Sequence, residues 1–262
     1  MTENKISFSV VIPVYNGELF IADAIESCLR QTVTPDEIIV IDDASIDHTA
    51  AVIKKMDSSL VVYRRNETNQ GPSFCRNIGM QLAKCSWIAF LDADDIFHPQ
   101  KIEIIRFYIS HNQNIKAIGH SFNFVSEPLF VPDESWQQKA LPSVITVKQM
   151  LVRNRMVTPS LAVAVSNGLL FDESMSYAED HDFILRTTEK FGIWFLDMRL
   201  CSLGRIPLTA GGITNNRWEM RKGEINMYIN YCKRNGLTLA IPFFIIFSLL
   251  KHAKNALFYR KG

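Results

Sequence analysis

The chain has 262 residues, with 28 lysines and arginines, 27 aspartates and glutamates, and a formal net charge of +1. Hydrophobic residues make up 47% of it and charged residues 21%, which excludes a disordered or fibrous chain. This length fits one domain, or two closely packed ones, with a proper hydrophobic core.

The first hundred residues alternate between strand and helix patterns. Short β-branched runs, typical of buried parallel strands, alternate with stretches that carry apolar residues at helical spacing. This order favours an α/β fold with a mainly parallel, Rossmann-like sheet and helices on both faces. The expected strands are 8–12, 37–41, 60–64 and 87–91, and the expected helices are 19–31, 49–56 and 72–83.

Polar clusters follow three of the expected strands. Ligands of such sheets bind beyond the carboxyl ends of the strands, so these clusters should open onto one crevice. They are Pro13-Val14-Tyr15-Asn16 after the first strand, Asp42-Asp43 after the second and Asp92-Ala93-Asp94-Asp95 after the fourth.

The last cluster predicts a metal site. Three carboxylates within four residues, at Asp92, Asp94 and Asp95, repel one another unless a cation or a hydrogen-bond donor neutralises them. Mg²⁺ prefers one or two carboxylates together with phosphate oxygens, so a metal bound to a diphosphate is a natural solution. A solvated strand end, with Asp95 capping the next turn, is the alternative, but the position after a buried strand favours the metal.

The second cluster predicts a site for a nucleoside. Asp42 and Asp43 lie too early to cap the helix expected at 49–56, for which Asp47 is better placed. A carboxylate here can accept from the ring N–H of a nucleobase or from ribose hydroxyls. The phosphate-binding patterns GxGxxG and GxxxxGK[ST] are missing. A nucleotide site in this chain must therefore handle phosphate through a metal and side chains.

These motifs resemble the successive signatures of family 2 glycosyltransferases, an inverting family with the GT-A fold. They occur in the family's order and spacing over residues 6–100. The resemblance implies a nucleotide-diphosphate-sugar donor, with a UDP-sugar expected, and Mg²⁺ or Mn²⁺ as cofactor. The resemblance rests on the three clusters above and on a fourth motif, Gly71-Pro72-Ser73-Phe74-Cys75-Arg76-Asn77-Ile78-Gly79. The second cluster is longer in this comparison and reads Asp42-Asp43-Ala44-Ser45-Ile46-Asp47-His48-Thr49.

The resemblance assigns three residues to the base of the donor. Tyr15 would stack on the base, Pro13 would line its pocket, and Asp43 would accept from the base N–H. A core aromatic is the alternative for Tyr15, because buried tyrosine is common.

Four more residues are assigned to the rest of the donor. Arg76 would lie near the donor phosphates or the base, and Asp92 would contact the ribose or the sugar. Asp94 would hold the metal, with Asp95 as the second ligand. A surface helix residue is the alternative for Arg76, although its place early in a helix points to the crevice.

The strand–helix alternation loosens after residue 113. The expected division is a nucleotide-sugar-binding half at 1–115, an acceptor-binding and catalytic-base half of the same domain at 116–235, and an apolar, basic and membrane-proximal helical tail at 236–262.

Acidic residues also mark the start of an expected helix at 181–191. Inverting transfer needs a general base that takes the acceptor hydroxyl proton as the oxygen attacks the anomeric carbon. The resemblance places a Glu-Asp pair here and gives the base role to Asp180, with Glu179 and Asp182 as rivals. Capping of the helix by all three acids is the alternative. His181 is expected to be a packing or hydrogen-bonding neighbour.

A turn-rich segment at 203–216 precedes another expected helix. Its glycines give mobility, and Arg205 and Arg217 supply charge. It resembles the loop that folds over the donor in related enzymes and excludes water. Thr214 is a further candidate there, although the usual His or Arg-x-His element before it is missing. An ordinary surface turn is the alternative.

The end of the chain is both basic and apolar. Residues 205–262 carry ten bases and two acids, whereas the first 204 residues carry 18 bases and 25 acids. The apolar run at 237–250 is shorter than the roughly 20 residues of a spanning helix, so we expect it to lie in a membrane interface. A helix that closes the core is the alternative. Nucleic-acid binding is not expected, since the acidic body has no basic, aromatic stripe.

The expected function is metal-dependent, inverting transfer of a sugar to a polyprenyl-diphosphate-linked oligosaccharide. This activity would serve bacterial surface polysaccharides such as O-antigen lipopolysaccharide, capsule or exopolysaccharide. No signal-peptide pattern occurs, and five scattered cysteines read as free thiols, so the enzyme is expected at the cytoplasmic face of the inner membrane. A non-catalytic nucleotide-sugar-binding module and a nucleotidyltransferase are the alternatives, although the latter usually has a Gly-rich basic loop after its first strand.

Overall fold

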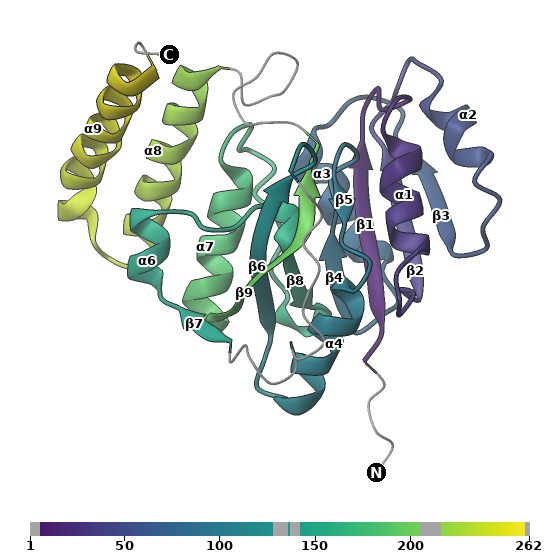
Figure 1. The fold of residues 1–262 in the computed structure, drawn as a ribbon. Coiled ribbons are helices and arrows are strands. Elements are labelled where there is room, and N and C mark those ends of the chain that lie inside the picture. Colours follow the sequence, from purple (N-terminus) through teal and green to yellow (C-terminus); the bar gives the residue numbers. More distant parts are fainter. Residues whose placement is uncertain (1–5, 128–135, 137–141, 205–215, 260–262) are drawn as a thin grey trace.

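The computed structural model describes residues 6–127, 136, 142–204 and 216–259 (Figure 1). The described residues form one β-sheet, and helices cover both faces of this sheet, which confirms the expected α/β architecture. The strands are β1 (Phe8–Val14), β2 (Glu37–Asp42), β3 (Val61–Arg65), β4 (Trp87–Phe90), β5 (Ile96–Phe97), β6 (Ala117–Phe124), β7 (Ser143–Ile145), β8 (Leu161–Ala164) and β9 (Ile193–Leu203).

The sheet is parallel in its N-terminal half and mixed in its C-terminal half. Its order is β3-β2-β1-β4-β8-β6-β9-β5, and β7 pairs with β9. Strands β1 to β4 pair in parallel, as the sequence predicts, whereas β8 runs antiparallel to both β4 and β6. The β4–β8 pairing carries the sheet across the expected boundary near residue 115, so both halves share one sheet.

Helices link the strands and pack on the two faces. Side chains of β1 alternate between the two layers. Val10 and Ile12 belong to the cluster formed with the helices at 21–29 and 101–111, and Val11 to the cluster with the helices at 72–82 and 179–191. The helices are α1 (Ile21–Leu29), α2 (Thr49–Lys54), α3 (Pro72–Leu82), α4 (Lys101–His111), α6 (Val147–Val152), α7 (Glu179–Phe191), α8 (Arg217–Arg234) and α9 (Ile241–Tyr259).

The C-terminal helix α9 packs along α8 at one edge of the molecule (Figure 1). The ring of Phe244 stacks on Tyr228 of α8 with 4.9 Å between centroids, and Phe247 lies edge-on to the same ring. Part of the predicted tail therefore extends the core. No helix in the described ranges has the length and apolar character needed to cross a membrane.

Helix α3 lies very close to the sheet at Gly79. A Cβ atom added at Gly79 would come within 2.3 Å of Val11 Cγ1, a buried side chain of β1. We expect Gly79→Ala to lower the free energy of unfolding by about 1–3 kcal/mol, because overpacking must displace the helix or the strand. Urea unfolding measures this. Gln81→Ala, on the exposed side of the same helix, should change stability by less than about 0.5 kcal/mol, and equal effects would contradict the argument.

Candidate active site

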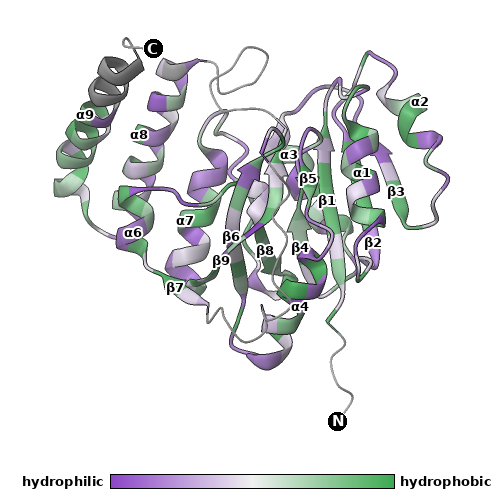
Figure 2. Ribbon diagram, viewed as in Figure 1, coloured by the Kyte–Doolittle hydropathy of each residue, from purple (hydrophilic) through white to green (hydrophobic). Residues whose placement is uncertain are grey.

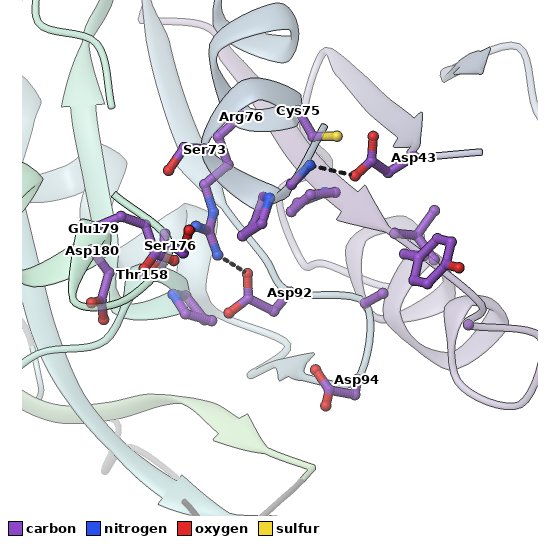
Figure 3. A pocket seen from close by; sticks show the side chains of 18 of the residues that line it. Asp43, Ser73, Cys75, Arg76, Asp92, Asp94, Thr158, Ser176, Glu179 and Asp180 are labelled. Atoms are coloured by element: carbon purple, nitrogen blue, oxygen red, sulfur yellow. Dashed lines mark hydrogen bonds and ion pairs between the residues drawn. The ribbon is translucent and has the colours of Figure 1, made fainter. Parts of the chain in front are cut away.

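A cleft of about 750 Å³ opens where β1, β2 and β4 end, and the start of α7 forms its opposite wall. The topology therefore gathers segments that lie far apart in the sequence, as expected for parallel strands. Figure 3 shows this cleft from close by. The residues predicted from the sequence that line it are Pro13, Tyr15, Asp43, Arg76, Asp92, Asp94, Asp95, Glu179 and Asp180.

One end of the cleft has the residues expected to bind a nucleobase. Tyr15 follows β1 and its side chain is 50% exposed, so the alternative of a core aromatic is wrong. Asp43 follows β2 and is buried. Its carboxylate accepts from the backbone N–H groups of Gln70 and Gly71 at 2.9 and 2.7 Å, and from Asn66 Nδ2 at 2.8 Å. These bonds fix the Asp43 carboxylate in place beside the loop that leads into α3.

Arg76 connects the two walls of the cleft. The side chain is only 6% exposed, and Nη2 donates to Asp92 Oδ1 at 2.7 Å while Nη1 donates to Glu179 Oε1 at 3.3 Å (Figure 3). Its guanidinium also lies 5.3 Å from the ring centroid of Phe171. The alternative of a surface helix residue is therefore wrong. Arg76 lines the cleft as predicted. Its ion pairs are with two carboxylates of the protein, so the predicted contact with the donor phosphates or the base stays a prediction.

The acidic turn after β4 fits a divalent metal through one carboxylate. Asp94 lies in the cleft wall, apart from the Arg76 ion pairs (Figure 3). The described residues contain no group of three His, Cys, Asp or Glu side chains placed to hold a metal. Mg²⁺ needs only one or two carboxylates when phosphate oxygens complete its shell, so Asp94 fits such an ion bound together with a diphosphate.

Asp95 has a different environment from Asp94. It is buried and accepts from the backbone N–H of Gly204 at 2.9 Å. Burial, together with the charges of Asp92 and Asp94, raises the pKa of Asp95 to about 8. Such an excess of negative charge is what a nearby cation would relieve. The role of Asp95 as a second metal ligand stays a prediction.

The start of α7 presents the candidate base. Ala178 precedes the helix in the left-handed region, with φ 58° and ψ 20°, which is uncommon for a residue other than glycine and occurs often at functional sites. This turn brings both Glu179 and Asp180 to the cleft. Glu179 is held by Arg76, whereas Asp180 accepts from the backbone N–H of His181 at 2.7 Å. Unlike Glu179, Asp180 forms no ion pair with any described residue.

The structure corrects the expectation for Asp182. This carboxylate is buried outside the cleft, where it pairs with Arg186 at 2.6 Å and with Arg234 at 3.4 Å. Residues two apart on a helix point to different sides, which explains the separation from Asp180. Asp182 is thus a structural residue that ties α7 to α8. His181 is buried with Nε2 3.1 Å from the Met150 carbonyl oxygen, which confirms its packing role.

Other cleft residues were not predicted. Thr158 and Ser176 lie beside Glu179 and Asp180 (Figure 3), and Glu173 also lines the cleft. They belong to a 3₁₀ turn before β8 and to the segment before α7, which carry no motif of their own. The sequence signal for Glu173 and Ser176 is their proximity to the acidic start of α7, whereas Thr158 is distant from it in sequence and has no such signal. Arg205 and Thr214 lie outside the described residues, and of Arg217 only the backbone position, the first residue of α8, is described.

Glu179, whose side chain is 14% exposed, should make the stability of the protein depend on pH. Burial and the Asp180 charge raise the pKa of Glu179 to about 7, although Arg76 acts in the opposite direction. An unfolded glutamate has a pKa of about 4.3, so between these values the folded state holds a proton that the unfolded state lacks. The free energy of unfolding should therefore fall as the pH rises from about 5 to about 8.

Glu179→Gln tests this effect because glutamine does not titrate. Urea unfolding at about pH 5 and about pH 8 should show a smaller decrease in the variant than in the wild type. Glu189→Gln, which alters an acid outside the cleft on the same helix, is the matched control. If Glu179→Gln has the same pH dependence as the wild type, Glu179 does not gain a proton on folding in this range.

Comparison with known proteins shows the family of the chain. The family model described as Glycosyl transferase family 2 matches residues 9–162, and the chain belongs to this family. An uncharacterized glycosyltransferase of Haemophilus influenzae is 30% identical over 195 residues, which cover 70% of this chain and 62% of that protein. One from Rickettsia conorii is 40% identical over 114 residues, or 43% of this chain and 18% of that protein. The chain thus spans less than two thirds of either relative.

Solved structures share the fold. TarS 1–349 of S. aureus in complex with UDP-GlcNAc aligns with a TM-score of 0.65 and 21% identity, over 86% of this chain and 67% of that chain. The mannosyltransferase PcManGT of Pyrobaculum calidifontis, in complex with GDP-Man and Mn²⁺, aligns with a TM-score of 0.63 and 14% identity, over 95% and 75% of the two chains. At these identities the likeness shows the fold, and the GT-A expectation is confirmed.

Proposed function

We propose that this chain transfers one sugar from a UDP-sugar to an acceptor hydroxyl, with inversion at the anomeric carbon. One observation carries the proposal: Asp94 and Asp180 reach the same cleft from separate elements, after β4 and at the start of α7. A metal-bound diphosphate at the first and an acceptor hydroxyl at the second would place the anomeric carbon between them. The UDP-GlcNAc complex of TarS supports a uridine donor.

The residues of the cleft divide the reaction between them. Tyr15 and Asp43 would hold the base and Asp94 the metal, which would neutralise charge on the leaving diphosphate. Asp180 would accept the proton of the acceptor hydroxyl while the new C–O bond forms and the bond from the anomeric carbon to the diphosphate breaks. The PcManGT complex with Mn²⁺ supports a divalent cofactor.

The proposed acceptor is a polyprenyl-diphosphate-linked oligosaccharide for a bacterial surface polysaccharide, at the cytoplasmic face of the inner membrane. The apolar and basic C-terminal segment supports a lipid-bound substrate, because such a segment favours an anionic membrane interface. Purified protein given a UDP-sugar should glycosylate a polyprenyl-diphosphate-linked sugar faster than the same sugar without the lipid. Equal rates with the lipid-linked and the lipid-free sugar would show that the enzyme does not recognise the lipid of its acceptor.

A donor panel tests the transfer itself. Purified protein with Mn²⁺ should slowly hydrolyse one nucleotide sugar, read out as released nucleoside diphosphate. We expect Asp94→Ala to lower this rate by at least about 100-fold, because the leaving diphosphate loses its metal. Asp23→Ala, on the exposed side of α1, is the control. Released pyrophosphate would indicate a nucleotidyltransferase, and binding without turnover, even with an acceptor, would indicate a non-catalytic module.

A further inference from the structure

Helix α9 is a fixed part of the molecule and has two different faces. Its inner face packs on α8 through Phe244 and Phe247. A polar cluster adds to this contact: Glu224 of α8 accepts from Ser248 Oγ at 2.6 Å and pairs with Lys251, both on α9. These contacts set the rotation of α9 about its own axis, so the orientation of its outer face follows from packing.

The outer face of α9 and of the turn before it is apolar and exposed. Leu239 is 97% exposed, Phe243 64%, Ile246 58% and Leu250 64%. Their spacing of four, three and four residues places them along one side of the helical segment. No described residue covers them, and Figure 2 shows α9 as largely hydrophobic up to its grey end. Four large apolar side chains in one row exceed the scattered single exposures of ordinary protein surfaces.

The charge of this segment favours an anionic occupant. The sequence from 237 to 262 contains no acidic residue, and besides Lys251, which pairs with Glu224, it carries Lys254, Arg260 and Lys261. A second copy of the chain would bring the same positive charge against it, whereas acidic phospholipid headgroups would complement it. Apolar side chains with flanking bases are the pattern of helices that lie in the plane of a membrane interface.

We propose that the outer-face row, Leu239, Phe243, Ile246 and Leu250, inserts into the interface of an anionic membrane and seats the protein there. The inference rests on the proposed function in one respect: membrane contact would bring the protein to an acceptor that is itself linked to a membrane lipid. Figure 1 shows that α9 runs toward the end of the molecule at which β1 ends, and the residues at this end of β1 line the cleft. The membrane contact and the acceptor entrance would then lie on neighbouring sides of the protein.

Vesicle sedimentation with the full chain tests the proposal. Wild-type protein should partition to vesicles of phosphatidylglycerol and phosphatidylcholine and much less to phosphatidylcholine alone. Ile246→Ser should weaken partitioning by about tenfold, because the variant loses the apolar side chain that leaves water on insertion. Ile46→Ser removes the same side chain from a loop near α2, where it is 85% exposed, and should have no effect. Both variants should unfold at the wild-type temperature.

Two outcomes would overturn the proposal. Partitioning of Ile246→Ser equal to that of wild type would exclude insertion of this row. A dimer of the wild-type chain that Ile246→Ser dissociates, without vesicle binding by either, would make the face an interface between copies. The same protein samples are also assayed, without vesicles, for hydrolysis of a soluble nucleotide sugar. This second measurement distinguishes failure of the membrane proposal from failure of the proposed function. Turnover without vesicle binding contradicts the membrane face alone, and vesicle binding without turnover of any donor contradicts the proposed function alone.

Discussion

Asp180→Asn should lower the rate of sugar transfer by about 10²–10⁴-fold, because the acceptor hydroxyl loses the base that removes its proton. Asparagine keeps the shape of the side chain and can still accept the 2.7 Å bond from the His181 N–H. The variant should therefore fold normally and bind the donor as tightly as the wild type. Steady-state kinetics with a saturating donor, together with calorimetric titration of UDP, separates the two effects.

Asp182→Asn is the matched comparison, since it makes the same change two residues along the same helix. Asp182 is buried against Arg186 and Arg234, so its loss of charge should lower the free energy of unfolding by about 1–3 kcal/mol. The transfer rate of the folded protein should stay near that of wild type, because Asp182 lies outside the cleft. If Asp180→Asn keeps its rate and Glu179→Gln loses it, the base is Glu179.

The N-terminal half of the fold could be predicted from local pattern. Strands β1, β2 and β4 are short β-branched or aromatic runs buried on both faces, and each precedes a polar cluster. Strand β8 is a four-residue apolar run, Leu161–Ala164, whose pairing with β4 is set by contacts across the sheet. Strand β9 begins one residue after α7, which is capped at Gly192 with φ 68°, and its pairing with β6 is likewise set by contacts across the sheet. Neither was predicted, because their partners are distant in sequence.

The candidate site, like the fold, could be predicted only where local sequence pattern decides the position of a residue. The cleft position of Asp43, Asp94 and Asp180 follows from where their strands and helix end, which a sequence pattern can indicate. The ion pairs of Arg76 are with residues 16 and 103 positions away, so no local spacing predicts them. Asp182 shows the limit of motif reasoning. Helical geometry places Asp180 and Asp182 on different sides of α7, but only the structure shows that the side with Asp182 is buried outside the cleft.

Arg76→Met should both destabilise the protein and reduce sugar transfer. The guanidinium is buried between Asp92 and Glu179, and its removal leaves both carboxyl groups without their cation. Breaking a buried pair from one side costs about 3–5 kcal/mol, so the variant should unfold at a clearly lower urea concentration. The rate should fall as well, because Arg76 holds the start of α7 against the turn after β4, and these two elements carry Asp180 and Asp94.

A double-mutant cycle separates the ion pair from simple loss of packing. Glu179→Gln in the Arg76→Met background removes a carboxyl group that has lost its cation, so it should recover part of the lost stability at about pH 8. In the wild-type background, where Arg76 offsets this charge, the same substitution should change stability less. Arg76→Lys should be intermediate, because one ammonium lacks the planar fork that reaches both carboxylates. If Glu179→Gln has the same effect in both backgrounds, the two residues are not coupled, and Arg76 would act through Asp92 and Phe171 alone.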